Sequence, residues 1–208
     1  MIVKRHFVLI GLAVSLAGGA ALAQVAPGEG AAVAARKNLR IREITGLGRN
    51  ALLQTPQYNA SGLAAKMPSR NWAQISVMFD APNDKDSWMD DVGVQFYVLL
   101  YNRVREEYSL LRNSQQLTDV GYGRGHQSAM YVRPAALLRY GEVVGVAVEL
   151  RVKGEVVDGL TDSKLPGGKK LTDKWWENSK LTVREGYLLK KSETPFALLA
   201  VDDFEYVK

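Results

Sequence analysis

The residues best suited to acid–base or metal chemistry are gathered in one acidic segment, residues 80–91. This segment contains five aspartates, including Asp84 and Asp86, and a single lysine. Clustered oxygen ligands in a loop can bind Ca²⁺, and paired carboxylates can act as general acid and base. The glycine and closing glutamate of an EF-hand are missing, which favours a solvated loop between strands over a calcium site or a catalytic pair.

Nucleophilic and zinc-dependent catalysis have little support elsewhere in the chain. The sequence has two histidines and no cysteine, and one of the histidines, His6, lies in the N-terminal leader. His126 alone cannot complete a multi-histidine zinc site, and a lone histidine without converging partners does not make a triad. The glycine-rich residues 121–125 before it would need a following helix to bind phosphate, whereas residues 127–132 resemble a strand. We therefore expect a hairpin or bulge there, a structural histidine, no enzymatic activity and no cofactor.

Tryptophans offer a different chemistry, because aromatic planes on a β-sandwich can stack on sugar rings. Trp88 lies in the acidic segment and is expected to be at least partly exposed. Trp175 and Trp176 are adjacent, so in an extended chain one would point into the core and the other outward. Large aromatic residues most often pack inside a protein. A glycan platform built from Trp88 and either Trp175 or Trp176 is therefore the alternative interpretation.

A basic loop complements the acidic segment. Lys164, Lys169, Lys170 and Lys174 surround the turn residues of a Pro-Gly-Gly sequence. The basic loop of one copy could contact the acidic segment of another, although charge runs are usually solvated. The formal net charge is only +5, and it falls further without Lys4 and Arg5, so nucleic acid is not an expected partner.

The first 23 residues have the three parts of a secretory signal peptide. Lys4 and Arg5 precede an apolar run over residues 7–16, and Ala21 to Ala23 form a small-x-small cleavage site. The run is shorter than the roughly 20 residues that cross a bilayer, so we expect cleavage and no transmembrane segment in the mature chain. Residues 24–38 are rich in Ala and Gly and predict a flexible leader. The mature protein is then exported, to the periplasm, the outer membrane or the cell surface.

Residues 39–208 are predicted to form the folded domain, since apolar and polar residues alternate there with the period of β-strands. In the first strand, Leu39 and Ile41 should share one face and Ile44 the other. A turn at Lys153 and Gly154 predicts a hairpin, and residues 134–140 predict a short helix that begins with a proline. The predicted strands are residues 39–44, 73–79, 92–100, 108–112, 127–132, 143–152, 155–159, 181–189 and 196–201. Short strands separated by turns, with little helix, predict an antiparallel all-β sandwich with one or two short helices.

Three stretches carry a family resemblance: residues 186–197, the Trp175 and Trp176 pair, and Asn71 with Trp72 leading into residues 75–79. Together they resemble the pilus-like protein family of verrucomicrobial bacteria, whose best known members come from a mucus-dwelling gut commensal. The resemblance runs from about Leu39 to the C-terminus. It implies an exported protein with an immunoglobulin-like β-sandwich, encoded beside type IV pilus machinery, without known enzymatic activity or a family active site.

Two functions follow as hypotheses. The first is a non-enzymatic envelope protein that acts through protein contacts, by self-association or with pilus components, with Asp84 and Asp86 facing Lys169 and Lys170 of a neighbouring copy. Loss of the apolar leader favours an accessory role over that of a filament subunit. The second is a glycan-binding sandwich for adhesion to host mucus. A carboxylate hydrolase has the least support.

Overall fold

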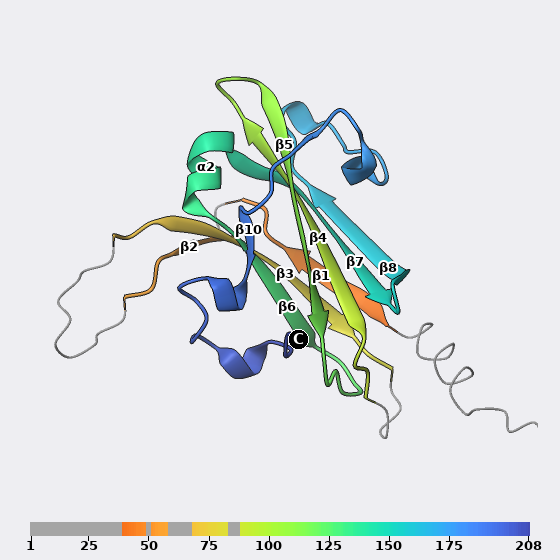
Figure 1. The fold of residues 1–208 in the computed structure, drawn as a ribbon. Helices are drawn as coiled ribbons and strands as arrows, with labels where there is room; N and C mark the ends of the chain where they lie inside the picture. Colours follow the sequence, from red (N-terminus) through yellow and green to blue (C-terminus); the bar gives the residue numbers. More distant parts are fainter. Residues whose placement is uncertain (1–38, 49–50, 58–67, 83–87) are drawn as a thin grey trace, which may run out of the picture.

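The computed structural model describes residues 39–48, 51–57, 68–82 and 88–208, which form two five-stranded sheets packed face to face (Figure 1). The predicted all-β sandwich is confirmed. The expected signal peptide, residues 1–23, and the expected flexible leader, residues 24–38, lie outside the described residues.

The first sheet has the order β1-β3-β6-β10. Its fifth strand, β2, also pairs with β3. All its pairings are antiparallel. Along β3, the side chains of Ala73, Ile75, Val77 and Phe79 are buried and alternate with less buried neighbours, as the sequence pattern predicts. Its strands are β1 (Arg40–Thr45), β2 (Leu52–Gln54), β3 (Asn71–Asp80), β6 (His126–Val132) and β10 (Leu188–Lys190).

The second sheet has the order β8-β7-β4-β5-β9. Its central strand β4 is hydrogen-bonded to β5 and β7 along nearly its whole length, in agreement with its apolar residues on both faces. Short β9 pairs with β5 in parallel, which departs from the fully antiparallel prediction. The strands are β4 (Val92–Asn102), β5 (Glu107–Leu117), β7 (Glu142–Val152), β8 (Glu155–Ser163) and β9 (Thr182–Val183).

Helical structure is sparse in the described residues. The predicted short helix is present as α2 (Pro134–Tyr140), and Pro134 lies in its first turn, where a missing N–H costs no hydrogen bond. The 3₁₀ turns are η2 (Pro166–Gly168), η3 (Trp175–Glu177), η4 (Lys191–Glu193) and η5 (Val201–Asp203). The helix connects β6 of the first sheet to β7 of the second.

Three hydrophobic clusters hold these layers together. The main core lies between the sheets, where Phe79, Phe96 and Leu111 are completely buried. A second cluster forms where residues after β8 fold over the outer face of the second sheet, with Trp175 at its centre. In the third, Phe196 from the C-terminal segment covers the outer face of the first sheet. Each sheet is therefore partly covered on both faces.

A β-bulge corrects the prediction for the first strand. Ile41 and Ile44 were expected on opposite faces, yet both are buried in the main core. The register shifts between Ile41 and Glu43, so Arg42 is an extra residue without a direct partner on β3. One extra residue reverses the alternation, which brings both isoleucines to the same side.

The last two predicted strands are largely wrong. Residues 181–189 are split into β9 and β10, with Gly186 in the positive-φ region between them. Residues 196–201 form no strand, because turns there place Phe196 against the first sheet. Their apolar residues belong to a segment that covers the first sheet, and they do not form a hydrogen-bonded strand.

The sequence predicted two chain reversals at glycine-containing segments. The hairpin at Lys153 and Gly154 is confirmed, with both residues at positive φ between β7 and β8. The hairpin or bulge expected around residues 121–125 is not found, since these residues lie outside the strands and connect β5 in the second sheet to β6 in the first.

Candidate functional site

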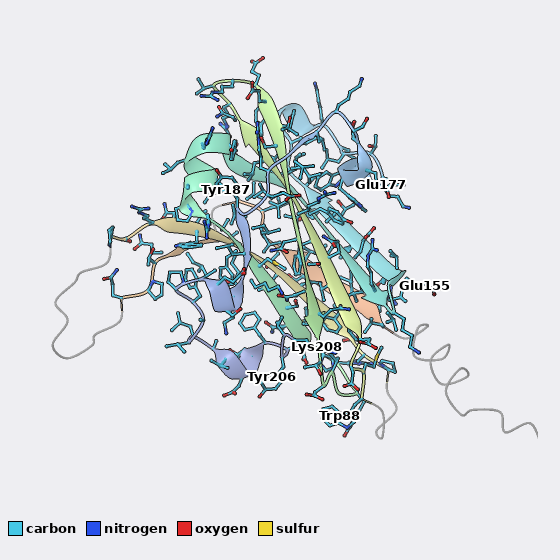
Figure 2. The ribbon with its side chains drawn as sticks, in the orientation of Figure 1. Trp88, Glu155, Glu177, Tyr187, Tyr206 and Lys208 are labelled. Atoms are coloured by element: carbon cyan, nitrogen blue, oxygen red, sulfur yellow. The ribbon has the colours of Figure 1, made fainter. Side chains whose placement is uncertain are left out.

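One end of the sandwich carries an exposed tryptophan, Trp88 (Figure 2). Trp88 is 66% exposed, and its ring lies near Gly121. Paired backbone hydrogen bonds between Met89 and Val120, of 2.9 and 3.1 Å, hold its position. We call this surface the acidic corner, and its members are Trp88, Asp90, Asp91 and Asp119, all exposed. Asp84 and Asp86, which the sequence singled out, lie outside the described residues.

Trp175 cannot serve as a glycan platform, which corrects that part of the alternative hypothesis. Its side chain is only 4% exposed, and its Nε1 donates a hydrogen bond of 3.0 Å to Thr161 Oγ1. Trp176 lies edge-on against it and stacks on Tyr97, with ring centroids 5.1 Å apart. The pair belongs to the second hydrophobic cluster because the outer face of the sheet would otherwise expose apolar residues to water.

The basic loop lies apart from the acidic corner within one copy. Lys169 and Lys170 are exposed just after η2, and Lys174 approaches Glu177 at 3.8 Å. Figure 2 shows Glu177, which follows this loop, in the upper part of the molecule and Trp88 at its lower end. A contact between the loop and the corner would therefore require two copies.

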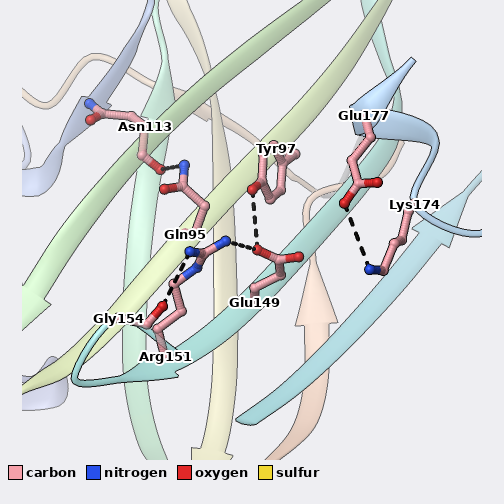
Figure 3. A network of polar contacts seen from close by, with 8 residues as sticks. All are labelled: Gln95, Tyr97, Asn113, Glu149, Arg151, Gly154, Lys174 and Glu177. Carbon is pink, nitrogen blue, oxygen red and sulfur yellow. Dashed lines mark hydrogen bonds and ion pairs between the residues drawn. The ribbon is translucent and has the colours of Figure 1, made fainter. Parts of the chain in front are cut away.

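A polar network on the second sheet was not predicted from the sequence (Figure 3). Tyr97 donates its hydroxyl hydrogen bond to Glu149 Oε2 at 3.1 Å, and Arg151 donates to the same oxygen at 2.7 Å. Burial and the neighbouring negative charge of Glu149 raise the pKa of Tyr97 above its ordinary value. The buried carboxylate is thus compensated by its own neighbours.

The opposite end of the sandwich has a groove of about 1100 Å³. It lies between β2 and β3, the turn from β4 to β5, and α2. Exposed apolar side chains line it, namely Leu52, Val104 and Leu138. Its charged residues are Arg70, Arg103, Arg105, Arg139 and Glu142. We call this surface the arginine groove. Sequence reasoning missed it because its residues come from segments far apart in the chain.

His126 has a structural role. Its Nδ1 lies 2.6 Å from Glu205 Oε1, and its ring stacks on Phe79 with centroids 5.4 Å apart. These contacts join the start of β6 to the C-terminal segment. Among the described residues, no group of three or more His, Cys, Asp or Glu side chains is placed to hold a metal ion.

The helical segments of the described ranges are short. None of the helices found there combines the length and the apolar character that crossing a membrane requires.

Comparison with known proteins identifies the family. The crystal structure of a protein from Akkermansia muciniphila superposes with a TM-score of 0.67 at 19% identity, over 82% of this chain and 93% of that chain. That likeness shows the fold. No curated protein matches the sequence. A family model, however, matches residues 34–208, which include every strand of the sandwich. The chain therefore belongs to the pilus-like protein family of verrucomicrobial bacteria.

Proposed function

We propose that this protein is an exported, non-enzymatic envelope protein that acts through protein contacts, as a pilus-like or pilus-associated component. The observation that carries the proposal is the family match over residues 34–208. The expected removal of residues 1–23 favours an accessory role, because a filament subunit of the type IV class keeps its apolar helix. The mature chain would then be released from the inner membrane to the periplasm, outer membrane or cell surface.

The β8 edge of the second sheet does not offer the best contact surface. β8 is the outermost strand of the second sheet, and a bare edge can pair with a strand of another chain. Asp158 on this strand accepts a hydrogen bond of 2.7 Å from the Ile41 N–H of β1, so part of the edge is already engaged. Asp162 adds an exposed charge. Contacts through the two ends of the sandwich are therefore favoured over strand addition at β8.

The proposal is tested in the native organism. Mature protein should appear in the envelope or external fraction, and N-terminal sequencing should find Gln24 as its first residue. A photo-crosslinking amino acid at position 88 should give adducts with protein partners, whereas one at the buried position 175 should give none. Protein that keeps Met1 and stays in the inner membrane, or that gives no adduct from position 88, contradicts the proposal.

Glycan binding is the second candidate, and the exposure of Trp88 favours it. An indole that is 66% exposed can stack on a sugar ring as well as on a protein group. With Trp175 buried, such a platform would depend on Trp88 at the acidic corner. Host mucus glycans would be the ligands under this alternative.

A further inference from the structure

We propose that the acidic corner of one copy docks into the arginine groove of a second copy, so that the protein associates head to tail. The inference rests on the proposed function through protein contacts, and it names the partner as another copy of this chain. It also replaces the basic loop with the arginine groove as the surface that receives the acidic residues.

The arginine groove has the chemistry to receive an aromatic residue flanked by carboxylates. Four guanidinium groups and a single carboxylate line the groove. The carboxylate, that of Glu142, forms an ion pair of 2.6 Å with Arg103. The groove therefore has an excess of positive charge. Leu52, Val104 and Leu138 supply apolar walls, and Val104 is 93% exposed. Guanidinium groups bind carboxylates with two parallel hydrogen bonds and also stack on indole rings.

The acidic corner has the complementary groups. The indole of Trp88 is 66% exposed, so it is available to a partner, and tryptophan is enriched among the residues that dominate protein interfaces. Asp90 and Asp91 follow it closely in the chain, and Asp119 precedes Val120, whose backbone pairs with that of Met89, so three exposed carboxylates belong to the same corner. Arg124, in the connection from β5 to β6, carries one positive charge. A tryptophan surrounded by charges that match the receiving surface is a frequent energetic centre of protein interfaces.

The position of the two surfaces determines how copies can join. Trp88 and Asp91 come just before β4, and Arg103 and Arg105 come just after it. An 11-residue strand spans about 35 Å, so the two surfaces are at opposite ends of the same strand and cannot meet within one copy. A contact between two different surfaces leaves one of each unused at the ends, so it can repeat. Copies therefore add in a row.

The basic loop is the weaker receptor for the same residues. Lys169 and Lys170 are exposed in the loop that follows η2, and neither lines the groove. Lysine ammonium groups are more strongly hydrated than guanidinium groups and bind carboxylates without the paired geometry of arginine. The groove combines charge with apolar walls, which an indole requires.

The test begins with the mature chain, residues 24–208, in sedimentation velocity over a range of concentrations. At about 50 mM NaCl the mean mass should increase with concentration beyond that of a dimer. At about 500 mM NaCl the apparent Kd should rise about tenfold, since salt screens exposed charges. A chain that is monomeric at every concentration in low salt overturns the inference.

Two variants locate the contact. Trp88→Ala removes the indole but keeps the groove, and Arg105→Glu alters the groove but keeps the corner. Each variant alone should associate at least tenfold more weakly than the parent chain. Mixed together, they should form dimers that do not grow, because the intact groove of the first accepts the intact corner of the second. Both sites are exposed, and thermal melts should show unchanged folding.

Lys170→Glu is the matched control, since it makes the same change of charge in the basic loop. Association like that of the parent chain supports the groove, and loss of association in this variant but not in Arg105→Glu overturns it. The envelope crosslinking experiment separates the two proposals. If position 88 gives adducts only with other proteins while the purified chain stays monomeric, the function through protein contacts holds and the head-to-tail inference fails.

Discussion

The phenyl ring of Phe196 stacks on the phenol ring of Tyr131, with centroids 4.9 Å apart and planes inclined by 10°. Trp72 meets the same phenyl ring edge-on at 5.8 Å. Phe196 thus fastens the C-terminal segment to two neighbouring strands of the first sheet, β3 and β6. The segment is part of the fold and covers an apolar face that would otherwise be exposed.

Replacing Phe196 with alanine should lower the free energy of unfolding by about 3 kcal/mol, because a buried aromatic ring is lost and a cavity remains. Urea unfolding followed by intrinsic fluorescence measures the change. Leu198→Ala is the control in the same segment, since Leu198 is 76% exposed, and its effect should stay within about 0.5 kcal/mol. Equal effects for the two variants would show that the segment does not pack as described.

Alkaline pH should destabilise the protein through Tyr131. Burial raises the pKa of its hydroxyl from 10.0 to about 12. The unfolded chain loses this proton first, so the stabilisation is complete below about pH 10 and is lost as the pH rises towards 12. At about pH 11.5 the loss from this group should be about 2 kcal/mol.

Tyr131→Phe removes that titration. Urea unfolding of both proteins at about pH 9 and about pH 11.5 should show a smaller loss of stability for the variant. Other groups titrate in both proteins, so the difference between them isolates Tyr131. Identical losses would contradict the assignment.

Gly141 should tolerate no side chain. It ends α2 with a φ of 94°, and a Cβ there would lie 2.0 Å from the backbone oxygen of Tyr101. Gly141→Ala should therefore lower the free energy of unfolding by about 3 kcal/mol or more. Gly154→Ala is the matched control, with a φ of 84° and open space around it, and should cost only about 1 kcal/mol. Chemical unfolding compares the two, and similar losses would mean that the close approach to β4 is not present.

Mucin oligosaccharides should leave the tryptophan fluorescence of the mature chain unchanged if Trp88 serves protein contacts. Stacking of a sugar ring on an exposed indole shifts its emission, so a titration is informative. Trp88→Ala is the control that assigns any signal to this residue. A saturable shift in the parent chain that is absent from the variant would favour the glycan-binding alternative.

Much of the fold could be predicted because alternation of side chains reports which face of a strand is buried. This holds for β3 and β4, which lie inside their sheets. It fails for β1, where the bulge after Ile41 cannot be seen in a pattern that assumes a constant period. It also fails around Phe196, because a covering segment needs apolar residues just as a strand does.

The candidate sites were less predictable. The sequence correctly indicated an exposed Trp88, which follows a run of polar residues, yet it could not decide between Trp175 and Trp176. That choice depends on a 3₁₀ turn and on a hydroxyl, that of Thr161, at the right distance. The arginine groove depends on where α2 and the turn after β4 meet, which local pattern does not report.

The central place of β4 also has a mechanical meaning. In a row of copies joined at the two ends of this strand, tension would run along its axis. The hydrogen bonds to β5 and β7 lie across that axis over nearly the whole strand, so pulling loads them in shear, all at once. Such a row would resist stretching far better than one pulled from a sheet edge, where bonds open one after another.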